Sequence, residues 1–304
     1  MGSGEGRRIG VDLGGTKIEA VVLHPNGDIE RRKRVPTPAA QGYDAIVDTI
    51  GGLVEEVEDG WGPLPVGIGT PGAVSRRTGT IKNSNTVALN GRTLREDLSR
   101  RLTRPIRMAN DANCLALSEA SDGAGSGHSV VFAAILGTGV GGGWCVNGQI
   151  LNGLQGIAGE WGHTPLEPET GPACYCGRRG CVETLLSGPG LLRDYRSSGG
   201  QVVATAEVVE RAAAGESLAR AVLDRYIARL GRALATVINI VDPDIVVLGG
   251  GVSKVEAIYS QIGAALAPHV FNDEVLTPVV AAKHGDSSGV RGAAWLWPVD
   301  EPGV

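Results

Sequence analysis

The sequence contains no apolar run long enough to cross a membrane. A membrane-spanning helix needs about 18–20 consecutive apolar residues, and no stretch of this 304-residue chain approaches that length. The N-terminal M-G-S-G-E-G-R-R also lacks the apolar centre of a secretory signal peptide. We therefore expect a soluble, cytoplasmic protein with no membrane partner.

An excess of charge of one sign is also lacking. The formal net charge is −5, and acidic and basic residues are interspersed. Nucleic-acid-binding domains usually carry a clustered basic face. The one basic run, Arg31-Arg32-Lys33-Arg34, fits an exposed strand face instead. We expect no nucleic-acid partner.

Cysteine is too scarce for a disulfide framework. The chain has five cysteines, an odd number, and no sign of a secretory context. Cys114 and Cys145 have apolar neighbours in sequence and fit buried, unreactive thiols.

The other three cysteines cluster with a histidine between Glu160 and Glu183. Three thiolates and one imidazole complete a tetrahedral structural zinc site and leave no position for water. Such a metal orders a loop rather than performing chemistry. We predict that zinc binds to His163, Cys174, Cys176 and Cys181.

The arrangement of turns predicts a duplicated fold. A chain of 304 residues exceeds the usual domain size of about 100–200 residues, so two domains are expected. Residues 8–35 read as strand, glycine turn, strand, Asn26-Gly27 turn and strand, and residues 129–151 repeat this order with Asn147-Gly148. Asn-Gly between apolar alternations is a strong hairpin signal. The sequence predicts an α/β protein with two similar lobes and a ligand cleft between them.

Periodicity places the remaining elements. Helical spacing covers residues 44–58, 112–120 and 217–240, and short buried strands are expected at 66–69 and 244–248. A last helix near 289–296 is expected to return to the first lobe. We predict an N-terminal lobe at 1–110, joined by the segment 289–304, and a C-terminal lobe at 111–288 that carries a zinc-binding loop at 160–183.

A glycine-threonine turn follows the first strand of each meander. Successive backbone N–H groups in such a turn can bind an anion, and Asp12 could hold Mg²⁺ through water. The alternative is a plain hairpin turn. Neither turn fits a Walker A loop or a dinucleotide fingerprint. Facing each other, the two turns could hold one polyphosphate through Gly14, Gly15, Thr16 and Lys17 on one side and Gly137, Thr138 and Gly139 on the other.

Three further segments are candidates for ligand contacts. Gly249-Gly250-Gly251 follows a predicted strand and is expected to open a helix, either as a simple turn or as a surface for adenine. Asn110-Asp111 begins a helix and fits an N-cap, while Asp111 also fits a general base for a sugar hydroxyl. Carboxylates, amides and imidazole suit a polyol, although Asn85 fits a loop turn equally well. The polyol candidates are Asn85, Asn110, Asp111, Glu160, His163 and Glu183.

Together, D-L-G-G-T-K, L-G-T-G-V-G-G-G, E-W-G-H and C-Y-C-G-R-R-G-C-V-E resemble the ROK family of sugar kinases and repressors. The resemblance extends over about residues 9–297 and implies the actin/hexokinase-like (ribonuclease H-like) duplicated fold. It implies that Asp111 is the catalytic base, that Asn85, Asn110, Glu160, His163 and Glu183 surround the sugar, and that His163 belongs to the zinc shell as well. The three glycine segments would contact ATP, with Asp12 near Mg²⁺.

Within this family the chain is most similar to the bacterial fructokinase branch, through I-K-N-S-N-T-V-A-L-N-G-R, N-D-A-N-C-L-A-L-S-E-A and K-H-G-D-S-S-G-V-R-G-A-A-W-L-W-P. We expect ATP-dependent phosphorylation of D-fructose at its C6 hydroxyl, with closure of the lobes excluding water. A broader hexokinase acting on mannose or glucose is the alternative. A sugar sensor without activity, or a repressor, is the alternative from another class. Only eleven residues precede Asp12, which is too few for the DNA-binding module of the repressors. The resemblance also implies a homodimer.

Overall fold

The computed structural model describes residues 5–299, and the chain divides into two compact units. The first lobe runs to Gly127 and includes Gly148–Ala158 and the chain from Asp286 onward. The second lobe comprises His128–Asn147 and Gly159–Gly285. The boundary predicted at residue 110 therefore falls inside the first lobe, because the helix after it packs within that lobe. Residues 300–304 of the predicted C-terminal segment lie outside the described residues.

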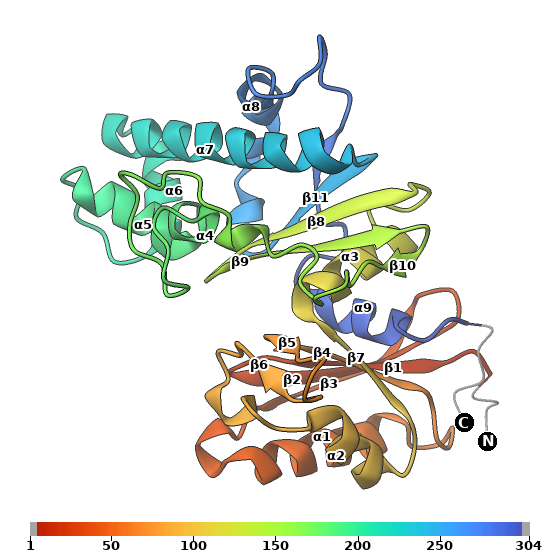
Figure 1. Cartoon of the computed structure of the whole chain (residues 1–304). Helices are drawn as coiled ribbons and strands as arrows, with labels where there is room; N and C mark the ends of the chain where they lie inside the picture. The colour runs from red at the N-terminus through yellow and green to blue at the C-terminus, as the bar shows by residue number, and fades with distance from the viewer. Residues whose placement is uncertain (1–4, 300–304) are drawn as a thin grey trace. The chain divides into compact units, whose positions relative to one another are not determined.

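The first lobe is built on a five-stranded mixed sheet of order β3-β2-β1-β4-β7 (Figure 1). Its strands are β1 (Arg8–Leu13), β2 (Lys17–Leu23), β3 (Ile29–Pro36), β4 (Val66–Thr70) and β7 (Ile106–Asn110). The meander β1-β2-β3 is antiparallel, whereas β4 runs parallel to β1 and β7 parallel to β4. The small strands are β5 (Ala73–Val74), β6 (Ile81–Lys82) and β10 (Gln149–Ile150).

Helices cover both faces of this sheet (Figure 1). On one face, α1 (Tyr43–Val57) and α2 (Leu94–Leu102) bury their apolar sides against the strands. On the other, α9 (Ser288–Trp295) packs on the sheet and on α3 (Asp111–Ser121). This approach requires glycine in the strands, since a Cβ on Gly10 would lie 1.9 Å from the Val290 carbonyl oxygen, and one on Gly67 would lie 1.9 Å from that of Ala293.

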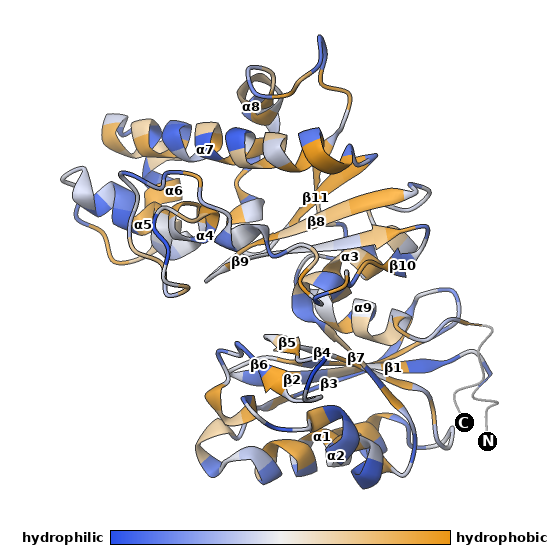
Figure 2. Ribbon diagram, viewed as in Figure 1, coloured by the Kyte–Doolittle hydropathy of each residue, from blue (hydrophilic) through white to orange (hydrophobic). Residues whose placement is uncertain are grey.

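The second lobe has a sheet in which β9 (Val140–Val146), β8 (Val130–Leu136), β11 (Ile245–Gly249) and β12 (Val279–Ala281) are neighbours in that order. Figure 2 shows β8 and β11 as mostly hydrophobic, as expected for buried strands. The long helix α7 (Ser217–Val241) has an apolar and a polar side and packs on α8 (Glu256–Leu266). The helices of this lobe are α4 (Val182–Leu186), α5 (Gly188–Ser197), α6 (Thr205–Ala213), α7 (Ser217–Val241) and α8 (Glu256–Leu266).

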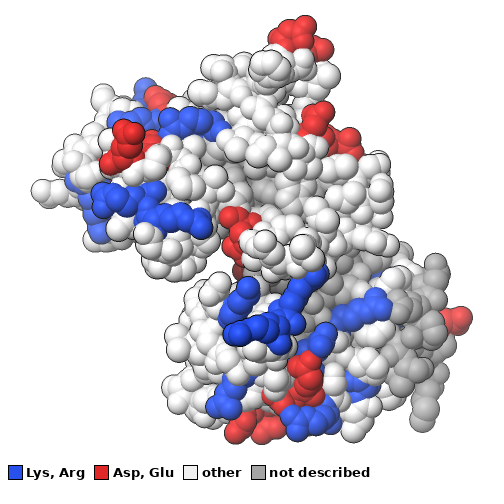
Figure 3. Space-filling view, in the orientation of Figure 1, with Lys and Arg blue, Asp and Glu red and all other residues white. Residues whose placement is uncertain are grey.

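The predicted elements agree closely with these bounds. The two meanders are present, and the helices predicted at 44–58, 112–120, 217–240 and 289–296 correspond to α1, α3, α7 and α9. One detail was wrong: the run Gly249–Gly251 leads into a short 3₁₀ turn (Val252–Lys254), and α8 begins only at Glu256. Within residues 5–299, no helix combines the length and the apolar character needed to span a bilayer. Acidic and basic side chains are scattered over each lobe on the face shown in Figure 3.

Candidate active site

The predicted cysteine–histidine set comes together in the second lobe. One ligand atom from each of His163, Cys174, Cys176 and Cys181 lies within 4.8 Å of all the others. The His163 Nδ1 atom is 3.6 Å from Cys174 Sγ, and the sulfurs of Cys176 and Cys181 are 3.6 Å apart. A tetrahedron with metal–sulfur bonds of about 2.3 Å has edges of about 3.8 Å. The four side chains therefore fit a tetrahedral metal ion.

The backbone around this cluster is organised by hydrogen bonds of its own. We refer to residues 160–183 as the Cys/His loop. The Cys174 N–H donates to the Arg178 carbonyl at 2.8 Å, and the Gly177 N–H donates to the Cys174 carbonyl at 3.0 Å. Arg178 also donates to the His163 carbonyl at 2.8 Å. This tight turn presents the sulfurs of Cys174 and Cys176 on the same side.

The Cys/His loop is attached to the body of the second lobe at two points. Near its start, the buried indole of Trp161 donates to the Gly141 carbonyl in β9 at 2.8 Å. Further along, the Glu167 carboxylate accepts from Arg229 in α7 at 2.9 Å and from Arg232 at 3.2 Å. Gly180 has φ +59°, and a Cβ there would lie 1.8 Å from the Glu167 carbonyl oxygen, so this position requires glycine.

Glu183 connects the Cys/His loop to the second glycine turn. It lies in the first turn of α4, and its Oε2 accepts a hydrogen bond of 3.0 Å from the Val140 N–H, directly after Gly139. A Cβ on Gly139 would lie 2.6 Å from the same oxygen. The turn is closed by the Gly137 N–H, which donates to the Gly139 carbonyl at 2.9 Å, while Thr138 is exposed. The Cys/His loop and the glycine turn at 137–139 therefore form one structural unit.

The third glycine segment lies against the same turn. Gly250 has φ +87°, and a Cβ there would be 2.5 Å from the Leu136 carbonyl at the end of β8. The Ser253 hydroxyl donates to the Gly250 carbonyl at 2.7 Å and fixes the following 3₁₀ turn. The second and third glycine segments were predicted in the same lobe. The structure places Gly250 beside the end of β8, which precedes Gly137. Gly251 is exposed.

Glu160 is exposed at the entrance to the short 3₁₀ turn Trp161–His163. In the same loop, the Tyr175 hydroxyl lies 2.8 Å from the His163 Nε2 atom. Burial of the hydroxyl and the nearby charges of Glu183 and Glu160 raise the pKa of Tyr175 to about 12. Tyr175 was not among the predicted residues, although its place between two ligating cysteines puts it beside the cluster.

In the first lobe, the glycine turn at 14–17 is held by Thr37. The Thr37 hydroxyl donates to the Gly14 carbonyl at 2.7 Å, and the Thr37 N–H donates to the Thr16 carbonyl at 3.0 Å. The Gly14 N–H donates to the Lys17 carbonyl at 3.0 Å. Gly15, Thr16 and Lys17 are exposed, so the tip of the turn is open to a ligand.

Asp12 precedes this turn, and its surroundings raise the pKa of its carboxyl group. Burial is the largest cause, and the negative charges of Asp111 and Glu19 add to it, so the pKa of Asp12 is raised to about 6. Gly289, at the start of α9, lies beside it: a Cβ there would be in ordinary contact, 3.5 Å from the Asp12 carboxylate. Two carboxylates at this position suit a site for a divalent cation.

Asp111 begins helix α3, where the sequence predicted it. Asn110 is the N-cap, and its side-chain oxygen accepts from the Ala112 N–H at 2.9 Å. The Asn110 amide also donates to the Gly72 carbonyl at 2.8 Å, which ties β7 to the loop after β4. The Ala112 N–H also reaches the Asp111 Oδ1 at 2.8 Å. The N-cap interpretation is confirmed, and the catalytic role of Asp111 stays a prediction.

Asn85 is exposed on a loop that Asn90 shapes. The Asn90 side chain accepts from the Ser84 N–H and donates to the Ser84 carbonyl, both at 2.9 Å. This pair of bonds folds residues 84–90 into a compact loop with Asn85 on its surface. Asn90 was not among the predicted residues, although its side chain shapes the loop that carries Asn85.

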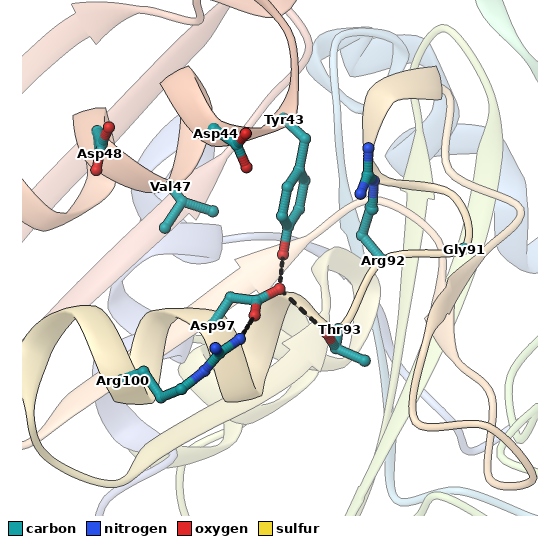
Figure 4. Close-up of a pocket in the computed structure, with 9 residues that line it drawn as sticks. All are labelled: Tyr43, Asp44, Val47, Asp48, Gly91, Arg92, Thr93, Asp97 and Arg100. Atoms are coloured by element: carbon teal, nitrogen blue, oxygen red, sulfur yellow. Dashed lines mark hydrogen bonds and ion pairs between the residues drawn. The ribbon is translucent and has the colours of Figure 1, made fainter.

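A cavity of about 570 Å³ in the first lobe lies away from the predicted residues (Figure 4). It is lined by residues of α1, α2 and the segment 91–93. Figure 4 shows Asp97 at its floor, bonded to Tyr43, Thr93 and Arg100. These polar groups satisfy one another, so they hold α1 and α2 together.

Known proteins match this chain over nearly its full length. The ROK family model matches residues 8–299. N-acetyl-D-glucosamine kinase of Escherichia coli strain K12 is 40% identical over 301 residues, which cover 96% of this chain and 99% of that protein. The ROK hexokinase structure from Thermus thermophilus matches with a TM-score of 0.86 and 32% identity, over 95% of this chain and 97% of that one.

A further solved structure matches nearly as well. It is a ROK family glucokinase from Streptomyces griseus in complex with glucose and AMPPNP, with a TM-score of 0.80 and 30% identity, over 95% of this chain and 98% of that one. The chain belongs to the ROK family, and it has the two-lobed, hexokinase-like α/β fold that the sequence predicted. Family and fold together define an ATP-dependent sugar kinase.

Proposed function

We propose that this protein transfers the γ-phosphoryl group of ATP to N-acetyl-D-glucosamine. The observation that carries the choice of sugar is the 40% identity to N-acetyl-D-glucosamine kinase of Escherichia coli, which extends over nearly the full length of both chains. This likeness changes the expectation from the sequence, which favoured fructose. The structures at 30–32% identity are a hexokinase and a glucokinase, so neither supports a fructose-specific enzyme.

In this proposal Asp111 is the general base. Its position at the start of α3, next to a fixed N-cap, holds the carboxylate still. A carboxylate within reach of a sugar hydroxyl can accept its proton as the oxygen becomes a nucleophile. Asn85, Asn110, Glu160, His163 and Glu183 are proposed to bind the sugar hydroxyls. ATP with Mg²⁺ supplies the phosphoryl group and neutralises its charge.

The glycine segments are proposed to bind the nucleotide. Their backbone N–H groups suit phosphate oxygens, and the two turns expose Gly15, Thr16, Lys17 and Thr138. We assign Gly249–Gly251 to the adenine side, because Gly250 lies against the strand end that leads into the second turn. Asp12 is proposed to lie near Mg²⁺.

The Cys/His loop is proposed to hold a structural zinc ion through His163, Cys174, Cys176 and Cys181. The spacing of these atoms and the softness of three sulfur ligands support zinc. Zinc bound there would not touch the reacting atoms. It would fix Glu160 and Glu183, which flank the loop at its two ends. Soluble, cytoplasmic and homodimeric states stay predictions.

The experiment that tests the choice of sugar is a substrate panel. Purified enzyme with ATP and Mg²⁺ is assayed on N-acetyl-D-glucosamine, N-acetylmannosamine, glucose, mannose and fructose. We expect the highest kcat/KM for N-acetyl-D-glucosamine. Fructose is the second candidate, because the segment S-N-T-V-A-L-N-G resembles the fructokinase branch. A maximum for fructose would replace the proposed substrate, and no turnover on any sugar would favour a sensor.

A further inference from the structure

We propose that Glu119 is a positioning residue that holds the start of helix α9 beside Asp12. It acts through Ser288 and Gly289, the first two residues of that helix. The contacts that carry this inference lie within the first lobe. Their consequence for the reaction rests on the proposed function, in which Asp12 lies near the Mg²⁺ that accompanies ATP.

Glu119 is a buried carboxylate near the end of α3, and the proposed reaction chemistry does not use it. The side chain is 0% exposed. Oε1 accepts from the Ser288 hydroxyl, and Oε2 accepts from the Ala124 N–H, both at 2.8 Å. A Cβ on Gly123 would lie 2.6 Å from the Glu119 Cα, so the chain after α3 closes tightly on this residue. A buried carboxylate needs such hydrogen bonds, and here they also fix its direction.

The first turn of α9 is joined to α3 through this carboxylate. Ser287 occupies the N-cap position, and its side chain makes no capping hydrogen bond within residues 5–299. Ser288 follows and is 1% exposed, so its bond to Glu119 lies in the interior. A carboxylate beside the first turn of a helix is also stabilising, because the N–H groups there carry a partial positive charge. Glu119 therefore fixes where α9 begins.

The same turn of α9 borders Asp12. A Cβ on Gly289 would lie 3.5 Å from the Asp12 carboxylate. Gly289 is bonded directly to Ser288, so a shift in the first turn of α9 changes the space beside that carboxylate. Functional side chains must be held close to their productive geometry by the residues around them. Helix α3 thus carries Asp111 at its start and, about two turns later, the residue that positions the neighbour of Asp12.

A second contact between the same two helices lies at the other end of strand β2. Arg291 of α9 is paired with Asp122, which follows α3. A Cβ on Gly27 would lie 2.4 Å from the Asp122 carboxylate. Gly27 belongs to the turn after β2, whereas the glycine turn at 14–17 lies at its start, about 20 Å away. The pair stabilises the packing of α9 far from Asp12, so it provides a matched control.

The first test measures binding and needs no turnover. Wild type, Ser288→Ala and Asp122→Asn are titrated by calorimetry with AMPPNP, with and without Mg²⁺, after circular dichroism has shown that each is folded. Ser288→Ala removes only the hydroxyl and adds no atoms to the helix. We expect it to lower the affinity for Mg²⁺–AMPPNP by about 10-fold, the lower end of the usual effect of residues that orient metal ligands. The affinity for AMPPNP without Mg²⁺ should be unchanged.

The control variant separates positioning from general stability. Asp122→Asn should lower the Tm, because it weakens the ion pair with Arg291, and should bind Mg²⁺–AMPPNP as wild type does. An unchanged affinity for Mg²⁺–AMPPNP in Ser288→Ala, or an equal loss of affinity in Asp122→Asn, would overturn the positioning role.

Coupling between variants tests whether Glu119 acts through Ser288. Glu119→Gln replaces one accepting oxygen by an amide group that only donates. Variants of two residues in one interaction are not additive. We therefore expect Glu119→Gln/Ser288→Ala to bind Mg²⁺–AMPPNP no more weakly than the weaker of the two single variants. Losses that multiply would show that the two residues act independently and would overturn the link.

Steady-state kinetics relate these results to the reaction. Ser288→Ala should raise KM for Mg²⁺–ATP by about 10-fold, with KM for N-acetyl-D-glucosamine unchanged. An equal rise in the sugar KM would show a general disturbance of the lobe and would overturn the positioning role. If wild type binds Mg²⁺–AMPPNP but turns over none of the sugars, the proposed function has failed, and the calorimetric comparison still decides the role of Glu119.

Discussion

The two glycine turns have the same place in their lobes but different surroundings. In the first lobe, Leu13 pairs with Ile18 and the turn spans residues 14–17. In the second, Leu136 pairs with Val140 and the turn spans 137–139. Each turn has a carboxylate beside it. Asp12 comes from the strand itself and is raised in pKa by burial and by neighbouring acids, whereas Glu183 comes from the Cys/His loop and accepts a backbone hydrogen bond.

This difference indicates a division of labour between the lobes. In the first lobe, burial and the negative charges of Asp111 and Glu19 raise the pKa of Asp12, a feature typical of functional sites. In the second lobe, the glycine turn is bonded to Glu183 of the Cys/His loop. We infer that the first lobe supplies the general base and the carboxylate near Mg²⁺, whereas the second lobe supplies ligand contacts that the Cys/His loop holds in place. The predictions below test this contrast.

The largest effect is expected from Asp111→Ala. If Asp111 is the general base, kcat should fall by about 10²–10⁴-fold, the usual contribution of positioned acid–base groups. Sugar binding should change less. Single-turnover kinetics with saturating ATP measure the chemical step, and Asp44→Ala, an exposed aspartate on α1, is the control. Near-normal turnover in Asp111→Ala would show that Asp111 is not the general base.

Cys176→Ser tests the supporting role of the second lobe. Loss of one of four ligands should lower zinc affinity by more than about 10-fold and raise the sugar KM before ATP binding changes. Metal analysis and separate KM values for sugar and ATP measure this. Cys145→Ala changes a buried thiol outside the cluster and should retain zinc. Full zinc content with unchanged kinetics in Cys176→Ser would show that the loop does not depend on the metal.

Asp12→Asn should stabilise the enzyme in the absence of nucleotide and Mg²⁺. The folded-state pKa of about 6 lies above the ordinary value of 3.8, so the protonated form is favoured by folding. Its contribution to stability is present below about pH 4 and is lost as the pH rises through about 6. At pH 7.5 the variant should be more stable by about 1–3 kcal/mol, with reduced activity. The Tm difference from wild type should shrink at pH 4.5, and its absence at pH 7.5 would contradict the account.

Glu183→Gln is the matched neutral variant in the second lobe, and we expect the opposite sign. A hydrogen bond to a charged group is stronger than one to a neutral group by about 1 kcal/mol. The variant should therefore lose about that much stability at pH 7.5. Chemical denaturation of Asp12→Asn and Glu183→Gln side by side measures both. Shifts of the same sign would show that the two turns do not differ as described.

The sequence predicted most of the fold because its local signals are strong. Asn26-Gly27 and Asn147-Gly148 identified both hairpins, and helical spacing placed α1, α3 and α7 within a few residues. The extent of the first lobe was missed. The helix after Asp111 belongs to it because α3 packs against α9, where a Cβ on Gly292 would lie 1.7 Å from the Cys114 carbonyl. Spacing along the chain does not reveal such long-range packing.

The contacts of the basic run Arg31–Arg34 were also not predictable from spacing along the chain. Sequence analysis placed Arg31–Arg34 on an exposed strand face, and β3 is indeed an edge strand. Its side chains are bonded on both sides of the sheet, however. Arg34 and Arg32 pair with the buried Glu19, while Arg31 donates to the Val57 carbonyl at the end of α1. Charges on an edge strand also discourage pairing with another sheet.

The residues of the candidate site could be predicted, but the contacts between them could not. The Cys/His spacing identified the metal cluster, since three cysteines and one histidine leave few alternatives. The bond from Val140 to Glu183, the hold of Arg229 on Glu167 and the contact of Tyr175 with His163 depend on side-chain directions. Only the folded chain fixes those directions.

One competition assay tests the central claim most directly. The enzyme is given equal concentrations of N-acetyl-D-glucosamine and fructose with limiting ATP, and the two phosphorylated products are measured by mass spectrometry. Their ratio equals the ratio of kcat/KM for the two sugars. We predict that N-acetyl-D-glucosamine phosphate predominates by at least about 10-fold, the value of one hydroxyl or methylene contact in a binding pocket. Predominance of fructose phosphate would contradict the account.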